Sequence, residues 1–201
     1  MQNPEPNEVI LASSSAYRRA LLARILSRFE TVSPDADETR QPGEAPPALS
    51  LRLARAKAAV VSARHPHATV IGSDQVAVLQ GRACGKPGSR DAAVAQLLAA
   101  RGLAMRFLTS VCVIHGSGSG DGSEERVHTD VTEVRFRHYE RALAERYVDR
   151  DRAWDCAGGF KAEGSGPVLF ERIESQDPTG LVGLPLIWLA RTLEGLGIPL
   201  L

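Results

Sequence analysis

The sequence predicts an α/β protein, a single domain in which helices flank a twisted, mixed central sheet. Short apolar runs alternate along the chain with segments of helical periodicity, a pattern typical of strands and helices that share one sheet. Two long segments rich in apolar and β-branched residues lie on either side of a Gly/Ser-rich stretch. They predict a hairpin, which makes the sheet mixed rather than purely parallel. With 201 residues, 43% of them hydrophobic, the chain can bury one core, divided at most between two lobes.

Residues 1–7 are predicted to form a flexible N-terminal extension, and residues 8–201 the domain itself. In the first half, an apolar run ends in three serines, and apolar residues then recur at helical spacing as far as Phe29. A proline-rich and acidic stretch without periodicity predicts a loop. The elements expected in this half are a strand at 8–12, a tight turn at the serines, a helix that carries the apolar residues from Leu21 to Phe29, a loop at 34–47, a helix at 49–61, and strand segments at 68–72 and 75–79.

The second half follows the same alternation. Gln80 and Gly81 predict a turn, Ser89 is placed to cap a helix, and Gly102 is a suitable end for that helix. The remaining expected elements are a hairpin of 105–114 and 126–136, a helix at 139–147, a glycine-rich loop at 157–166, a strand at 168–173 and a helix after Pro185. The stretch 116–123 lacks a lysine and a following helix, so it predicts a solvated linker rather than a phosphate-binding loop.

The composition excludes several classes of function. Twenty-four basic residues balance twenty-four acidic ones, so no strong overall field attracts a nucleic-acid polymer or an anionic membrane. The chain starts without a secretory signal pattern and has no apolar stretch of membrane-spanning length, which predicts a cytoplasmic protein. Its cysteines, Cys84, Cys112 and Cys156, lack the paired spacing of structural zinc sites. We expect small, buried, reduced thiols rather than nucleophiles.

The first chemical signal is the segment that contains Ser13, Ser14, Arg18 and Arg19. Two arginines in the first turn of a helix are unfavourable, because a helix N-terminus carries partial positive charge. An anion that shares the site removes this cost, and serine hydroxyls, free N–H groups and a guanidinium together suit a phosphate. A serine cap with two solvated arginines explains the same residues equally well.

Acidic and basic side chains elsewhere extend this picture. Asp37 and Glu38 lie in the predicted loop, and Asp74 ends an apolar strand, where open α/β sheets bind ligands. Hard divalent cations such as magnesium take one or two carboxylates together with substrate phosphates, although Asp74 alone also suits a turn cap. Lys57 on a helix and Lys86 in a Gly-Lys-Pro turn are either phosphate-binding charges or surface lysines.

The five histidines show no spacing suited to a metal site, and no serine lies in a nucleophile-elbow context. A Ser-His-Asp hydrolase is therefore not expected. From the residues alone, the sequence predicts an α/β protein that binds phosphate and has a possible metal.

Several motifs in combination resemble the Maf family of nucleotide pyrophosphatases. The segment Leu11 to Leu22, LASSSAYRRALL, is similar to the opening signature of that family, with Ala16 in place of the usual proline. Position N1 of a helix only prefers proline, so this departure should matter little. The resemblance continues in chain order through Asp37-Glu38, Leu53-Ala54-x-x-Lys57-Ala58, Gly72-Ser73-Asp74-Gln75, Gly85-Lys86-Pro87 and Gly183-Leu184-Pro185-Leu186.

The resemblance implies the fold of Maf proteins and inosine triphosphatases, and hydrolysis between the α and β phosphates of a nucleotide. It places the catalytic acid at Asp74, as water-orienting base and metal ligand, and a second metal ligand at Glu38. Arg18, Lys57 and Lys86 become phosphate clamps, and Ser13 and Ser14 supply loop contacts. A divalent cation, magnesium or manganese, and a homodimer are also implied. Which of the two carboxylates accepts the proton stays open.

Base choice in the family follows three positions, which hold Tyr17, Gln75 and Glu163 here. An aromatic residue, a glutamine and a glutamate resemble the branch that acts on 7-methyl-GTP, whose positively charged base suits an aromatic face and a carboxylate. Tyr17 could instead pack at a helix start, and Glu163 could be a solvated loop charge. The alternatives for the whole protein are a dTTP/UTP pyrophosphatase of the same fold and a nucleotide-binding regulator of septum formation.

Overall fold

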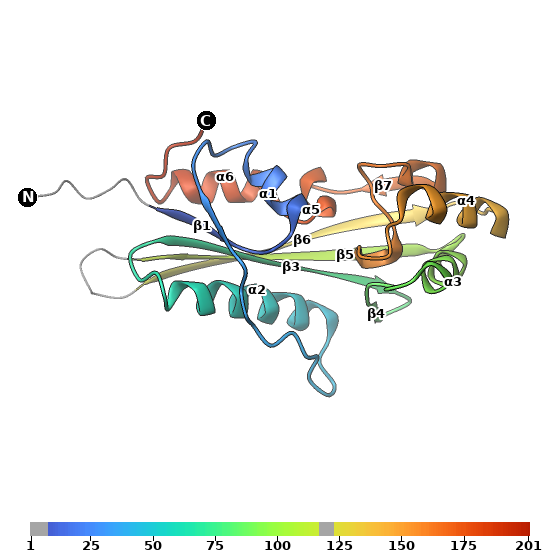
Figure 1. Cartoon of the computed structure of the whole chain (residues 1–201), viewed down its shortest axis with the longest axis horizontal. Coiled ribbons are helices and arrows are strands. Elements are labelled where there is room, and N and C mark those ends of the chain that lie inside the picture. Colours follow the sequence, from blue (N-terminus) through green and yellow to red (C-terminus); the bar gives the residue numbers. More distant parts are fainter. Residues whose placement is uncertain (1–7, 117–122) are drawn as a thin grey trace, which may run out of the picture.

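A seven-stranded mixed sheet runs through the centre of the protein (Figure 1). The computed structural model describes residues 8–116 and 123–201, so the predicted extension 1–7 and most of the predicted linker lie outside the described residues. The strands are β1 (Val9–Ala12), β2 (Glu30–Val32), β3 (Thr69–Leu79), β4 (Arg82–Cys84), β5 (Ala104–His115), β6 (Glu124–Phe136) and β7 (Phe170–Glu174). The helices are α1 (Ala16–Leu22), α2 (Pro46–Ser62), α3 (Arg90–Ala100), α4 (Arg141–Asp151), α5 (Pro178–Val182) and α6 (Leu186–Glu194), with 3-10 turns η1 (Ala157–Gly159) and η2 (Gly166–Leu169).

The sheet order is β2-β1-β3-β5-β6-β7, with β4 added to the far part of β3. Strands β2, β1 and β3 are parallel, whereas β3, β5, β6 and β7 pair in antiparallel fashion. The predicted hairpin is therefore confirmed as β5 and β6, and the predicted mixed sheet is confirmed with it. Within the described residues, no helix combines the length and apolarity needed to cross a membrane.

Helices cover both faces of the sheet, and the strand period of two explains how (Figure 1). On one face, Ile10 packs in a buried cluster with Ala54 and Ala58 of α2. On the other face, the next residue, Leu11, packs with residues of α1 and α6 such as Leu22 and Leu189. Because strands buried on both sides carry continuous apolar runs, the sequence of β1 reads as unbroken apolar residues.

A separate core lies at the other end of the long strands β3, β5 and β6. Here α3 and α4 pack with a buried cluster that includes Phe107, Phe136 and Phe160. The rings of Phe107 and Phe160 meet edge to face at a centroid distance of 5.2 Å, a favoured aromatic geometry. Two groups of helices are thus joined by one continuous sheet, as Figure 1 shows.

Several predicted boundaries were wrong. The first helix ends at Leu22 rather than Phe29, and the chain forms the short strand β2 soon after. Strand β3 is continuous from Thr69 to Leu79 because its pairing with β5 is unbroken over that whole range. Asp74 therefore lies within a strand and not at its end.

Three further features differ from the sequence-based expectations. Strand β4 and helix α5 were not predicted, since each is too short to show a hydrophobic period. Cys112 is buried as expected, but Cys84 and Cys156 are only half-buried. Burial raises the pKa of Cys156 to about 11, so it remains a thiol at neutral pH.

Candidate active site

A gap along one edge of β3 creates the site. Strand β1 pairs with β3 only as far as Gly72, and β4 pairs with it only from Ala77 onward. Among the described residues, no strand pairs with residues 73–76 on this edge. Successive side chains of a strand point to opposite faces, so Asp74 faces α2 while Gln75 faces α5, as their contacts show.

A cleft of about 840 Å³ lies at this gap. It is large enough for a nucleotide-sized ligand, since small-molecule sites commonly measure about 300–1,000 Å³. All ten residues to which the family resemblance assigns a role in the site line it: Ser13, Ser14, Tyr17, Arg18, Glu38, Lys57, Asp74, Gln75, Lys86 and Glu163. Residues from the N-terminal, middle and C-terminal parts of the sequence thus share one cavity.

The segment after β1 forms one wall of the cleft. Ser15 is the N-cap of α1, and its hydroxyl accepts a hydrogen bond from the backbone N–H of Arg18 at 3.4 Å. The side chain of Arg18 is not merely solvated, because its Nε donates to the carbonyl oxygen of Gly183 at 2.9 Å. Burial lowers the pKa of Arg18, but a guanidinium stays charged. Its two terminal nitrogens bond to none of the described residues and are free for an anion.

A lysine between two carboxylates forms the opposite wall. Lys57 Nζ contacts Asp74 Oδ1 at 2.7 Å and Glu38 Oε1 at 3.0 Å. Lys57 and Asp74 are buried, whereas Glu38 is exposed. Burial raises the pKa of Asp74 above its ordinary value, and the charges of Lys57 and Arg18 oppose that effect. Asp74 is therefore more basic than an ordinary aspartate, and its contact with Lys57 holds it in a fixed position.

Gly72 allows α2 to approach β3 closely enough for this contact. A Cβ atom at Gly72 would lie 2.6 Å from the backbone nitrogen of Ala58 and would also meet the carbonyl oxygen of Ala54. Both atoms belong to the backbone of α2, one turn of helix apart, and cannot move aside as a flexible side chain does. The absent side chain at Gly72 thus sets the distance at which Lys57 meets Asp74.

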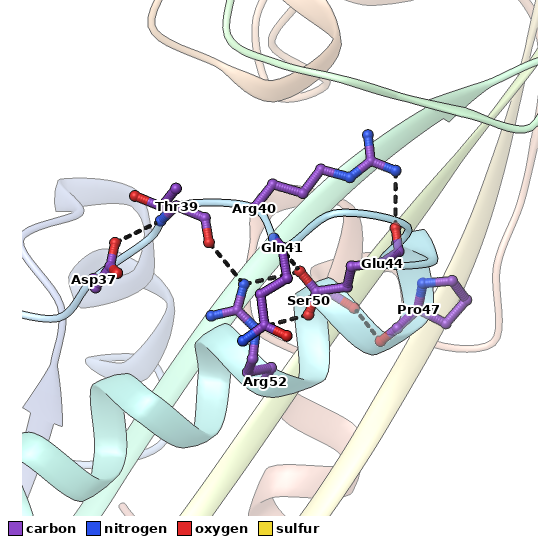
Figure 2. Close-up of polar contacts among 8 residues, drawn as sticks. All are labelled: Asp37, Thr39, Arg40, Gln41, Glu44, Pro47, Ser50 and Arg52. Carbon is purple, nitrogen blue, oxygen red and sulfur yellow. Dashed lines mark hydrogen bonds and ion pairs between the residues drawn. The ribbon is translucent and has the colours of Figure 1, made fainter.

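The loop that carries Glu38 is anchored to α2 by Arg52 (Figure 2). Arg52 binds both carboxylate oxygens of Glu44, at 2.7 and 2.9 Å, and donates to the carbonyl oxygen of Thr39 at 3.0 Å. These hydrogen bonds lower the pKa of Glu44 to about 2. The anchor fixes the backbone next to Glu38, which helps to explain how an exposed loop residue reaches Lys57.

Asp37 does not join the carboxylates of the cleft. Its Oδ1 accepts the backbone N–H of Thr39 at 2.8 Å (Figure 2). Hydrogen bonding by the side chain of Thr39, and then by its backbone, lowers the pKa of Asp37. The predicted grouping of Asp37 with Glu38 and Asp74 is therefore wrong for Asp37, which caps a turn instead. The pair at the cleft is Glu38 and Asp74.

The far end of the cleft offers an aromatic ring and a carboxylate. Tyr17 is half-buried, and Lys161 Nζ lies 5.8 Å from the centre of its ring. Glu163 is exposed at the same cavity. Lys86 is also exposed and contributes a positive charge from the loop that follows β4.

Gln75 faces the opposite side of the sheet from Asp74. Its amide nitrogen donates toward Thr109 Oγ1 at 2.9 Å and toward the carbonyl oxygens of Gly180 and Leu181 at 3.1 and 3.0 Å. These acceptors fix the orientation of the amide, since only the nitrogen can serve them. The carbonyl oxygen of the Gln75 side chain is the part left for a ligand.

Sequence reasoning missed the residues that hold these side chains in place. Gly183 was noted only as part of a motif, and Asp177 was not noted at all. A usable signal was present, because Asp177 followed by Pro178 is a typical N-cap with proline at N1. Phe107 also lines the cleft and carried no recognisable sequence signal, whereas Cys156 and Phe160 line it from a stretch, Cys156 to Gly164, that resembles the 7-methyl-GTP branch.

Replacing Lys57 by Met is expected to raise the pKa of Asp74. The Lys57 ammonium lowers that pKa both by its charge and by its hydrogen bond, so its removal leaves burial less opposed. Titration of the Asp74 carboxyl by carbon-13 NMR measures the shift. Lys86→Met is the matched control, because Lys86 makes no contact with Asp74 and should leave its pKa nearly unchanged. An unchanged or lower pKa in Lys57→Met would contradict the arrangement.

Comparison with known proteins gives a consistent result. A family model described as "Maf-like protein" matches residues 8–196. A protein named 7-methyl-GTP pyrophosphatase from Xanthomonas oryzae pv. oryzae (strain MAFF 311018) is 54% identical over 193 residues, 96% of this chain and 98% of the relative. One of the same name from Alcanivorax borkumensis is 47% identical over 194 residues, 96% of each chain. The solved structure of the Staphylococcus aureus Ham1 protein shares the fold, with a TM-score of 0.52 and 16% identity over 94% of this chain and 99% of that one.

Proposed function

This chain belongs to the Maf family, and from that membership we propose that it is a nucleoside triphosphate pyrophosphatase acting on 7-methyl-GTP. It would cleave the bond between the α and β phosphates and release 7-methyl-GMP and diphosphate. The names of its full-length relatives support the substrate. The observation that carries the proposal is the cleft itself, where Arg18, Lys57 and Lys86 line the same cavity as the carboxylate of Asp74.

The proposed reaction needs a water molecule aimed at the α phosphorus and a group to accept its proton. As the water oxygen bonds to phosphorus, the bridging oxygen leaves with the diphosphate and the proton passes to Asp74. Asp74 suits this role better than Glu38 because it is buried within a strand, whereas Glu38 is exposed on a loop. Burial also raises the pKa of Asp74, which favours acceptance of a proton. This assignment addresses the choice between the two carboxylates that the sequence left open.

Three cations would hold the phosphates. The free terminal nitrogens of Arg18 can bind two phosphate oxygens at once, and Lys86 adds a charge on the exposed side of the cleft. Two of the three N–H donors of Lys57 already bind carboxylates. It is therefore chiefly a partner of Asp74 and Glu38, with one donor left for a phosphate oxygen. Positive charge at these positions stabilises the charge that develops on the departing diphosphate.

The residues of the cleft also fit a divalent cation, magnesium or manganese. No cluster of three or more His, Cys, Asp or Glu side chains suited to a metal occurs within the described ranges. Magnesium, however, commonly takes only one or two carboxylates and completes its shell with waters and substrate phosphates. Glu38 and Asp74 each bind Lys57 through one oxygen, and the second oxygen of each would hold the cation. When bound, such a cation would neutralise phosphate charge and polarise the phosphoryl oxygens.

Base recognition would lie at the Tyr17 end of the cleft. A base methylated at N7 carries a positive charge, which an aromatic face and a carboxylate both attract. Tyr17 and Glu163 offer these two groups, and the fixed side-chain oxygen of Gln75 can accept a hydrogen bond from the base. A free nucleotide as substrate agrees with the cytoplasmic location expected from the sequence. A homodimer, implied by the family, is open to measurement by analytical ultracentrifugation.

A panel of nucleoside triphosphates with diphosphate release as the readout tests this proposal. We expect the highest kcat/KM with 7-methyl-GTP in the presence of magnesium or manganese. Equal or faster turnover of dTTP or UTP would favour the related pyrophosphatase instead. Saturable nucleotide binding without turnover of any member of the panel would favour a regulatory protein.

Replacing Glu163 by Gln is expected to weaken selection for the methylated base. The preference for 7-methyl-GTP over GTP should fall about tenfold, equivalent to about 1.4 kcal/mol, because a carboxylate no longer faces the positive ring. Competition between the two nucleotides measures this ratio directly. Glu171→Gln is the matched control, since Glu171 is exposed on β7 and does not line the cleft. An unchanged ratio in Glu163→Gln would remove Glu163 from base recognition.

A further inference from the structure

Two side chains that do not line the cleft hold the turn from α5 into α6 in one conformation. Asp177 is buried, with 4% of its surface exposed. Its Oδ1 accepts the N–H and the hydroxyl of Thr179 at 3.0 and 2.6 Å, and its Oδ2 accepts the N–H of Ile187 at 2.7 Å. The Thr179 hydroxyl accepts the N–H of Leu186 at 2.8 Å. One carboxylate thus joins the start of α5 to the start of α6.

The backbone carbonyls of this same turn orient side chains of the cleft. The carbonyl oxygen of Gly183 accepts hydrogen bonds from Arg18 Nε at 2.9 Å and from the Ser73 hydroxyl at 3.0 Å. The carbonyls of Gly180 and Leu181 accept the amide nitrogen of Gln75. The phosphate side and the base side of the cleft therefore depend on the placement of α5 and of Gly183, the residue that caps its C-terminus.

A row of polar side chains across three strands fixes where α5 docks. Gln75, Thr109 and Asp130 are neighbours in register on β3, β5 and β6. The Thr109 hydroxyl donates to the carbonyl oxygen of Gly180 at 2.9 Å. No side chain fits at position 180. A Cβ atom at Gly180 would meet the carboxylate of Asp130, whose Cγ would lie 2.9 Å away. The helix is thus placed closely against the row.

We propose that Asp177 is a positioning residue for the reaction: it does not line the cleft, but through α5 and its C-cap Gly183 it places Arg18 and Gln75. This inference rests on the proposed function for the identity of the reaction. It differs from a purely structural helix cap in one respect. A cap alone lowers stability, whereas a positioning residue also lowers activity in molecules that remain folded, and most of that loss of activity requires Arg18.

A double-mutant cycle separates the two. With 7-methyl-GTP, Asp177→Ala should lower kcat/KM about tenfold in the folded protein, since a small misplacement of a catalytic group is costly. Arg18→Ala should lower it about a hundredfold. The double variant should resemble Arg18→Ala alone, because the two residues act in series. A loss of about a thousandfold in the double variant, as independent residues would give, would overturn the proposal.

Tyr139→Phe is the matched control. It removes a buried hydrogen bond, from the Tyr139 hydroxyl to the carbonyl oxygen of Leu97 at 2.6 Å, in the core that contains α3 and α4. It should lower the melting temperature and leave kcat/KM unchanged. If Tyr139→Phe and Asp177→Ala lose activity in equal proportion to their lost stability, Asp177 is only a cap and the proposal fails.

A milder variant and a second readout keep the test independent of folding and of substrate identity. Thr179→Val keeps the shape of the side chain but removes its hydroxyl, and should reproduce a smaller loss of the same kind if Asp177→Ala does not fold. Calorimetric binding of inorganic diphosphate to Asp177→Ala and Thr179→Val needs no turnover. If the protein hydrolyses no triphosphate, the proposed function fails. Weaker binding of diphosphate by these variants than by the wild type would still support the positioning role. Wild-type binding by the folded variants would refute it.

Discussion

Asp74→Asn is expected to lower kcat for 7-methyl-GTP hydrolysis about a thousandfold, the scale of a lost general base. The asparagine has nearly the same shape and can still accept a hydrogen bond from Lys57, so the cleft should keep its form. The substitution removes the ability to take a proton from water, together with the second carboxylate oxygen that would hold the cation. Diphosphate release under saturating substrate measures kcat, and calorimetry with the nucleotide measures binding, which should persist.

Asp37→Asn is the matched control for this experiment. Asp37 precedes Glu38 in the same loop, but its carboxylate caps Thr39 and does not line the cleft. We therefore expect nearly wild-type kcat from this variant. If Asp74→Asn retained activity within about tenfold of wild type, another group would have to accept the proton, and Glu38 would become the first candidate.

Gly72→Ala is expected to destabilise the protein by about 3 kcal/mol, as overpacking against rigid backbone does. The added Cβ would meet the Ala54 carbonyl and the Ala58 nitrogen of α2, so the helix must move away from β3. Urea unfolding monitored by circular dichroism gives the change in the free energy of unfolding. Gly85→Ala is the control, because a Cβ at Gly85 meets nothing within 4 Å and the backbone there has no positive φ. Equal stability of the two variants would show that α2 packs less closely than described.

Gly72→Ala should also disturb chemistry in whatever fraction stays folded. Lys57 follows Ala54 by three positions, on the part of α2 that the new methyl group displaces. A shifted helix separates the Lys57 ammonium from Asp74, which would alter the pKa of that carboxyl as the Lys57→Met variant does.

The alternation of helices and strands, and the hairpin of β5 and β6, were predictable because hydrophobic periodicity is a local property. Strand β3 shows where that property fails. Ser73, Asp74 and Gln75 interrupt its apolar run, yet pairing with β5 keeps it extended. Helix α5 contains only five residues, and its carbonyl groups accept hydrogen bonds from Gln75 and Thr109, which are far away in the chain.

The site was predictable to the extent that motifs mark residues. The ten selected side chains do line one cleft, but the sequence could not show which of them contact one another. Lys57 was expected to grip phosphate and instead lies between two carboxylates. Asp37 and Glu38 are adjacent, and only the fold of their loop decides which one reaches the cavity. The dependence of Arg18 on a carbonyl at Gly183 is a tertiary contact without any local pattern.

The hydrogen bond from Arg18 to Gly183 joins residues 165 positions apart. Closing so long a loop costs chain entropy that only the finished fold repays, whereas a hairpin such as β5 and β6 closes over a short distance. We therefore expect the guanidinium to be secured late in folding, once α5 and Gly183 have docked on the sheet. Conversely, local unfolding of the segment around α5 would abolish activity while most of the secondary structure of the protein persisted. Competence to bind triphosphate therefore reports on completion of the native state more sensitively than helix or strand content does.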